Sequence, residues 1–157
     1  MAPRYFSVGV LLSWLVLCAM SMQPARSGLS GKWEPYTPER VSQSLALHKP
    51  VVIDFSAEWC PGCHILEKEV FTDPRISSKL AQVTTLRVDA TYMGSSKVQD
   101  LLDQYQVIGL PTVVFLDAKG NEIRRARVEG AGPVEEFLQS FQLLAKEANI
   151  TFEEGQK

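Results

Sequence analysis

Apolar and polar residues alternate along this chain in blocks that predict strands and helices in turn. Short apolar runs with the length and β-branched content of buried strands cover residues 51–55, 83–89 and 112–116. Segments with apolar residues at helical spacing predict helices over residues 37–47, 63–71, 73–80, 96–105 and 133–146. This order predicts an α/β protein with one central mixed β-sheet and helices on both faces.

A hairpin is expected after the last of these apolar runs. Residues 117–121, Asp-Ala-Lys-Gly-Asn, predict a tight turn because Gly and Asn tolerate a positive φ. The segment that follows, residues 122–128, is therefore expected to pair back as an edge strand. Arg124, Arg125 and Arg127 are expected to keep that edge soluble.

The N-terminal segment has the three-part layout of a secretory signal peptide. Arg4 lies near the start, residues 8–20 are apolar, and small and polar residues follow. This apolar core is short for a membrane-spanning helix, which needs about 20 residues. We therefore expect residues 1–27 to be a signal peptide cleaved after Ser27 or after Ser21, with an uncleaved membrane anchor as the alternative.

The rest of the chain divides by composition into a linker, a domain and a tail. Residues 28–36 contain Gly, Ser and Pro and are expected to be a linker. Residues 37–146 contain the predicted elements and are expected to form one domain. Residues 147–157 are polar and are expected to be a frayed, flexible tail.

Composition and charge narrow the classes of function. With 157 residues the chain suits one domain, and 45% hydrophobic residues exclude wholesale disorder. The formal net charge of -2 provides no basic surface, so we expect no nucleic-acid partner. Three cysteines are too few for a fold held together by disulfides. Cys18 lies in the apolar core of the leader, where it is expected to act as a hydrophobic residue.

The candidate chemistry lies in residues 59–64, Trp-Cys-Pro-Gly-Cys-His, between a predicted strand and a predicted helix. A helix N-terminus supplies free N–H groups and a partial positive charge, which stabilise a thiolate at Cys60 and lower its pKa. Cys63 lies one turn further, so the two sulfurs come within bonding range. Pro61 suits the first turn, where no N–H is needed. The pattern predicts a redox-active pair with Cys60 as nucleophile and Cys63 as resolving thiol.

Two carboxylates are expected close to this pair. Asp54 lies inside an apolar strand, where burial raises the pKa of an acid and makes it a candidate proton acceptor for Cys63. Glu67 lies four residues after Cys63 on the same helix face, where it is placed to exchange protons or tune the thiol pKa values. The alternatives are a hydrogen-bonded structural acid at Asp54 and a solvated surface acid at Glu67.

Pro111 stands at the entry of a predicted buried strand, where it removes a backbone donor. A cis Leu110–Pro111 bond in a tight turn facing the cysteines would explain its presence. On local sequence alone the alternative is a trans proline at a sheet edge, because only about 5–6% of X–Pro bonds are cis.

These motifs together resemble the thioredoxin superfamily. Residues 54–63, DFSAEWCPGC, are similar to its signature, and residues 109–112, Gly-Leu-Pro-Thr, are similar to its cis-proline loop. More closely, residues 49–76, 89–102 and 107–122 resemble the C-terminal thioredoxin-like domain of the DsbD family of thiol:disulfide interchange proteins. The resemblance extends over about residues 38–145.

The resemblance implies a thioredoxin fold and a thiol–disulfide oxidoreductase. It implies no cofactor other than a redox-active Cys60–Cys63 disulfide, with Asp54 and Glu67 flanking and tuning the cysteine pair. It also implies a cis Pro111 and a backbone role for Leu110 in pairing with a substrate strand. The surround of the site is then expected to include Trp59, Pro61, Gly62, Leu110 and Pro111.

Partners and compartment also follow as expectations from this resemblance. Substrate proteins with disulfides or thiols are expected, with a membrane or soluble thiol protein as electron donor. We expect a monomer that acts as a reductant after export, most simply in a bacterial periplasm. The dipeptide between the cysteines is Pro-Gly, and His64 stands where a Lys is common, so a thiol oxidant or isomerase on the same fold is the alternative.

Two other classes of protein fit residues 60–64. The pattern Cys-x-x-Cys-His is typical of covalent c-type haem attachment with His64 as an axial ligand, but the remaining candidates for a distal ligand, Met93 and His48, have no suggestive setting. The same residues offer three ligands to a metal, whereas a closed zinc site needs four. We therefore expect no metal and expect His64 to be an exposed helix residue.

Overall fold

A mixed five-stranded β-sheet forms the centre of the fold. The computed structural model describes residues 33–153. The strands lie in the order β1-β3-β2-β4-β5, with bounds Glu34–Pro35, Thr84–Asp89, Val51–Ser56, Thr112–Leu116 and Val128–Glu129 in that order. Strand β2 pairs parallel with β3 and antiparallel with β4. The predicted α/β class with a central mixed sheet is confirmed.

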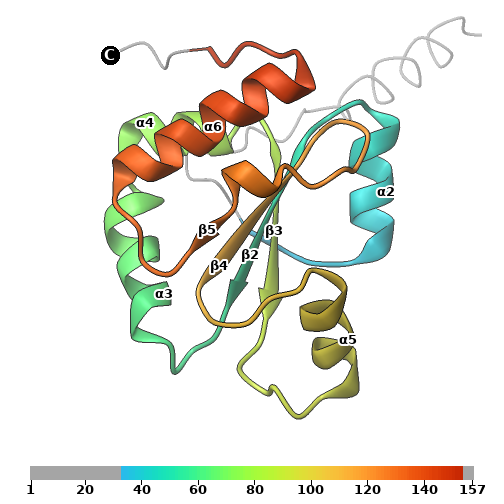
Figure 1. The fold of residues 1–157 in the computed structure, drawn as a ribbon, viewed down its shortest axis with the longest axis vertical. Helices are drawn as coiled ribbons and strands as arrows, with labels where there is room; N and C mark the ends of the chain where they lie inside the picture. The colour runs from blue at the N-terminus through green and yellow to red at the C-terminus, as the bar shows by residue number, and fades with distance from the viewer. Residues whose placement is uncertain (1–32, 154–157) are drawn as a thin grey trace, which may run out of the picture.

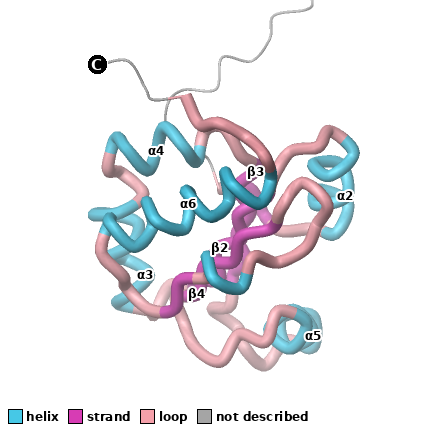
Figure 2. The backbone as a smooth tube through the Cα atoms, turned by 45° about the horizontal axis from the view of Figure 1, so that its top comes forward, coloured by secondary structure: helices cyan, strands magenta, loops and turns pink. Residues whose placement is uncertain are grey.

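Helices cover both faces of this sheet (Figure 1 and Figure 2). Helices α2 and α5 lie on one face, whereas α3, α4 and α6 lie on the other. Their bounds are Pro38–Ala46 for α2, Pro61–Ile65 for α3, Pro74–Leu80 for α4, Ser96–Gln104 for α5 and Val134–Ala148 for α6. A π-helical turn, η3, extends α3 over Leu66–Val70. The helices predicted from apolar spacing are confirmed, with bounds shifted by a few residues.

Strand β2 divides the core into two halves. Side chains alternate between the two faces of a strand, so Val51, Ile53 and Phe55 pack on the side of α2 and α5. Val52 packs on the opposite side, in the cluster that includes residues of η3, α4 and α6. Asp54 shares the face of Val52. The strand therefore directs one buried acid toward the helix that carries the cysteines.

The sheet edge after β4 differs from the expected strand over residues 122–128. Leu116 and Glu122 form an isolated bridge, and a short 3-10 helix, η4, occupies Arg124–Ala126 before pairing resumes at β5. The expectation that Arg127 is a solubilising edge charge is wrong, because its side chain is only 7% exposed. A guanidinium so enclosed needs acceptors for its N–H groups. The turn through η4 brings it to Glu122 and to backbone carbonyls.

The prediction that residues 28–36 form a linker is wrong for residues 33–36, the part that the structure describes. Glu34 and Pro35 form β1, which pairs in parallel with the outer edge of β3. Trp33 packs its ring against Phe71 at a centroid distance of 4.9 Å. The signal peptide expected over residues 1–27 lies outside the described residues. Within residues 33–153, no helix combines the length and apolar character needed to cross a bilayer.

The tail expected from residue 147 is also corrected. Helix α6 continues to Ala148, and the chain then turns back along the domain. The ring of Phe152 meets Phe141 edge-on at 5.4 Å, and Gln82 exchanges two hydrogen bonds with the backbone of residue 153. The aromatic side chain of Phe152 in an otherwise polar segment was the sequence signal for this packing. The packing extends the folded domain through residue 153.

Replacing Arg127 with Ala should lower the free energy of unfolding by about 3 kcal/mol. The change leaves the Glu122 carboxylate without its enclosed cation and the Tyr105 carbonyl without its donor. Urea denaturation measures the effect. The matched control is Arg125→Ala, which breaks the pair with Glu147 at a side chain that is 69% exposed, and its effect should stay below about 0.5 kcal/mol. Equal losses in the two variants would contradict the structural role of Arg127.

Candidate active site

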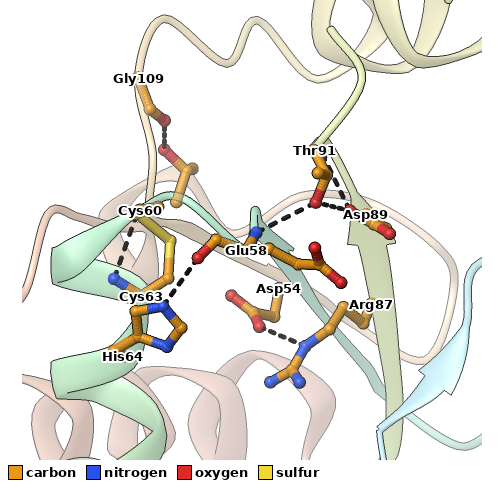
Figure 3. Close-up of a disulfide and its surroundings, with 10 residues drawn as sticks. Asp54, Glu58, Cys60, Cys63, His64, Arg87, Asp89, Thr91 and Gly109 are labelled. Atoms are coloured by element: carbon orange, nitrogen blue, oxygen red, sulfur yellow. Dashed lines mark hydrogen bonds and ion pairs between the residues drawn. A yellow bond between two sulfur atoms is a disulfide. The ribbon is translucent and has the colours of Figure 1, made fainter.

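The two cysteines of the predicted redox pair are joined by a disulfide at the start of α3 (Figure 3). Cys60 is the N-cap residue of this helix, and the backbone N–H of Cys63 donates to its Sγ at 3.2 Å. Pro61 occupies the first helical position, where its missing N–H leaves no bond unmade. Both cysteines are buried, with 3% of Cys60 and 8% of Cys63 exposed. The two residues therefore expose only a small part of their surface.

The loop before β4 closes over the start of α3. The Leu110–Pro111 peptide bond is cis, the geometry that the resemblance implies. A Cβ atom at Gly62 would lie 2.9 Å from Cδ of Pro111, a distance at which the atoms overlap. Glycine at this position thus permits the close approach of helix and loop. Leu110 packs beside Cys60 and Cys63 in the same apolar cluster.

Asp54 lies beside this disulfide in an ion pair with Arg87 (Figure 3). The two residues are register partners on the parallel strands β2 and β3, and Nε of Arg87 donates to Oδ2 of Asp54 at 2.8 Å. Nη2 of the same guanidinium donates to the carboxylate of Glu67 on η3. Both acids that the sequence places near the cysteines therefore share one cation.

Burial raises the pKa of Asp54 to about 6, and the charge of Arg87 offsets part of that rise. The side chain of Asp54 is 3% exposed, so its ionised form loses nearly all of its hydration. An acid with such a pKa accepts and releases a proton close to neutral pH. Asp54 is therefore a buried carboxylate whose pKa lies close to neutral pH.

A pocket of about 250 Å³ opens beside the disulfide. Cys63, Glu67 and Arg87 line it, together with Glu58 and Asp89. Charged side chains thus line an open pocket next to Cys63. In the part of the chain that the structure describes, no group of three or more His, Cys, Asp or Glu side chains is arranged to hold a metal ion.

The residues on either side of the cysteine pair have partners of their own. Trp59 is 55% exposed, and its Nε1–H donates to the backbone carbonyl of Thr91 at 3.0 Å. His64 is an exposed residue of α3, as expected, and its Nε2 lies 2.8 Å from the carbonyl oxygen of Glu58. In this structure Cys60 and Cys63 form a disulfide, and His64 is hydrogen-bonded to the backbone.

Sequence reasoning missed Arg87 and Thr91. Arg87 is the cation of its strand, and both it and Asp54 lie two residues before the ends of their strands. Aligning the predicted strands, residues 51–55 and 83–89, at their ends would instead pair Asp54 with Val88, so the register that brings Arg87 to Asp54 came from the structure. Thr91 lies in a loop, where contacts depend on how distant segments are brought together.

Comparisons with known proteins agree with this geometry. A family model described as a thioredoxin-like domain matches residues 38–145. Thiol:disulfide interchange protein DsbD of Vibrio vulnificus (strain CMCP6) is 39% identical over 111 residues, which cover 68% of this chain and 18% of that protein. DsbD of Salmonella choleraesuis (strain SC-B67) is 36% identical over 132 residues, covering 83% of this chain and 23% of that protein. The chain thus spans about a fifth of the length of these curated relatives.

Solved structures share the same architecture. A thioredoxin from Thermus thermophilus matches with a TM-score of 0.64 and 31% identity, covering 76% of this chain and 90% of that chain. The oxidised C-terminal domain of Neisseria meningitidis DsbD matches with a TM-score of 0.59 and 21% identity, covering 71% of this chain and 97% of that chain. At that identity the second match supports the fold alone.

Replacing Asp54 with Asn should remove a pH dependence of stability. The folded-state pKa of Asp54, about 6, lies above the ordinary value of 3.8, so the folded state binds an extra proton between these pH values. Ionisation of Asp54 should therefore lower wild-type stability by about 2.4 kcal/mol as pH rises from 4 to 7. Asp54→Asn cannot ionise, so this fall should be absent. Urea denaturation of the oxidised protein at pH 4 and pH 7 measures the difference.

An exposed acid serves as the control for this experiment. Asp103 is an exposed residue of α5. The variant Asp103→Asn should therefore retain the wild-type fall between pH 4 and 7. If Asp54→Asn also retains it, the ionisation of Asp54 is not its cause.

Proposed function

Because this chain belongs to the thioredoxin-like domain family and is a thiol–disulfide oxidoreductase, we propose that it reduces disulfides of partner proteins with its Cys60–Cys63 dithiol. The observation that carries the proposal is the disulfide at the N-terminus of α3, between the Pro111 loop and the Asp54–Arg87 pair. The proposed reaction uses no cofactor beyond this disulfide.

The proposed reaction begins with the reduced protein. The Cys60 thiolate attacks one sulfur of a partner disulfide, so a Cys60–partner bond forms and the departing partner sulfur leaves as a thiolate that takes up a proton. Cys63 gives its proton to Asp54 and attacks Sγ of Cys60. This step restores the intramolecular disulfide and releases the second partner sulfur. Two electrons pass to the partner, and the cysteine pair is oxidised.

Arg87 is proposed to keep the charges balanced during resolution. Its guanidinium contacts both Asp54 and Glu67. When Asp54 takes the proton of Cys63 and loses its charge, Glu67 still pairs with the guanidinium. No uncompensated cation is then left beside the sulfurs, where a partly buried charge without a partner would be unfavourable. Glu67 is thus proposed to tune the site through Arg87 and to offer a second proton acceptor at the pocket.

A partner protein is proposed to bind across the exposed surface around the disulfide. Trp59 and Ile108 are large apolar side chains that are 55% and 92% exposed. These two exposed side chains belong to the segments that carry Cys60 and Pro111, and they are proposed to contribute to one contact surface. The backbone of Leu110, beside the cis Pro111, is proposed to pair with an extended segment of the partner.

We propose that the protein acts after export, as a monomer, and as a reductant. The support for export is the leader pattern of residues 1–27, and the support for reduction is the similarity to thiol:disulfide interchange proteins. A membrane or soluble thiol protein must then restore the dithiol after each turnover. N-terminal sequencing of protein recovered from the envelope of its host tests export, since an intact Met1 in a cytosolic fraction would contradict it.

Serine substitutions separate the roles of the two cysteines. Cys60→Ser should abolish reduction of a protein disulfide such as that of insulin, because the attacking thiolate is gone. Cys63→Ser should instead accumulate mixed disulfides between Cys60 and partners, visible on non-reducing gels. Cys18→Ser is the matched control and should keep full activity. Full activity in Cys60→Ser would show that the mechanism is wrong.

The direction of electron flow follows from the reduction potential. Equilibration of the Cys60–Cys63 pair in a dithiothreitol redox buffer should give a value near that of thioredoxins, about −270 mV. Such a value makes the dithiol a reductant toward most partner disulfides. A value near that of strongly oxidising thiol proteins, about −120 mV, would reverse the proposed direction and favour the oxidant alternative.

A further inference from the structure

The loop between β3 and α5 is hydrogen-bonded to the turn that precedes Cys60. Thr91 lies between β3 and α5, and its Oγ1 accepts the backbone N–H of Glu58 at 3.0 Å (Figure 3). Its backbone carbonyl accepts the Nε1–H of Trp59 at 3.0 Å. One residue thus contacts both residues that stand directly before the attacking cysteine.

Asp89 orients the hydroxyl group of Thr91. Oδ1 of Asp89 accepts the backbone N–H of Thr91 at 2.9 Å and also its Oγ1–H. Because the single hydroxyl proton is committed to Asp89, a lone pair of Oγ1 is free to face the N–H of Glu58. The hydroxyl is therefore held in the orientation that the turn requires.

The backbone carbonyl of Glu58 is hydrogen-bonded to a side chain of α3. The carbonyl oxygen of Glu58 can only accept, so Nε2 of His64 donates to it, at 2.8 Å. The backbone N–H of Cys60 closes the turn by donating to the carbonyl of Ala57 at 3.1 Å. The loop thus binds the backbone N–H of Glu58, and the helix binds its carbonyl oxygen. The geometry of this turn sets where Cys60 lies relative to the first N–H groups of α3.

We propose that Thr91 is a positioning residue for Cys60, acting through the backbone of Glu58. In the oxidised protein the disulfide itself keeps Sγ of Cys60 at the helix start, where the N–H of Cys63 donates to it. After reduction that covalent link is gone, and the hydrogen bonds of the turn hold the sulfur in place. A sulfur held there is stabilised as a thiolate by the free N–H groups of the helix.

The inference rests on the proposed function only in taking Cys60 as the attacking thiol. Its test needs no partner disulfide, because it measures the alkylation of Cys60 by iodoacetamide as a function of pH. The full chain is reduced, freed of reductant and alkylated. Tandem mass spectrometry then separates modification of Cys60 from that of Cys18 and Cys63. Loss of disulfide reduction and loss of the Thr91 effect are therefore independent results.

Thr91→Val keeps the shape of the side chain and the backbone carbonyl that accepts from Trp59. Without the hydroxyl, however, it cannot accept a hydrogen bond from the backbone N–H of Glu58. The alkylation midpoint of Cys60 should rise by about half a pH unit, which lowers the rate below the midpoint by about threefold. Thr91→Ala, which removes the hydroxyl without adding apolar bulk, should shift it in the same direction. Thr91→Ser keeps the hydroxyl and should titrate as the wild type does.

Thr84→Val is the matched control for the loss of one threonine hydrogen bond. Thr84 accepts from the hydroxyl of Ser44 at 2.8 Å at the opposite end of β3. This variant should lose stability in urea and keep the wild-type midpoint. Every variant retains the charged residues that line the pocket with Cys63, and Thr91→Ser also retains the hydroxyl that donates to Asp89, so comparing it with Thr91→Val isolates the loss of that hydroxyl. A wild-type midpoint in Thr91→Val, or an equal shift in Thr84→Val, would overturn the inference.

Discussion

The burial of the Asp54 carboxylate under the helix that carries the cysteines requires a compensating positive charge. Asp54 lies on the central strand with neighbours on both sides, where an unpaired charge is strongly unfavourable. Strand β3 supplies Arg87 at the same register, and the guanidinium extends to Glu67 on the turn that follows α3. The pair that makes Asp54 tolerable therefore also ties the cysteine helix to the sheet. Sheet stability and the proton affinity of the site depend on the same contact.

The order and direction of the strands bring the parts of the site to one edge. Strand β2 ends just before the turn to Cys60, and the antiparallel β4 begins beside that end, with Phe55 opposite Thr112. Pro111 therefore stands next to the start of α3 and contacts Gly62. Strand β3 runs parallel to β2, so the loop with Thr91 emerges at the same edge. Three segments far apart in the sequence thus meet at the edge of the sheet where the disulfide lies.

Part of this arrangement could be predicted from the sequence, because it depends on local physics. Apolar spacing and capping residues identify the helices, and the isolated acid in an apolar strand identifies Asp54 as a buried group with a raised pKa. The expected edge strand over residues 122–128 was wrong for a tertiary reason. Arg127 turns inward because Glu122 and nearby carbonyls can receive its donors, and no local pattern reveals those acceptors.

By itself, the sequence determined that two cysteines lie one helical turn apart at a helix start, an arrangement that favours thiol–disulfide exchange. It also determined that an acid lies near them, because strand alternation directs Asp54 toward the face of α3. Only the tertiary structure decided which distant groups lie around the cysteine pair. Arg87 and Thr91 reach the site through strand pairing and a loop contact, and such contacts depend on the register and path of distant segments. Local sequence patterns do not encode these distances.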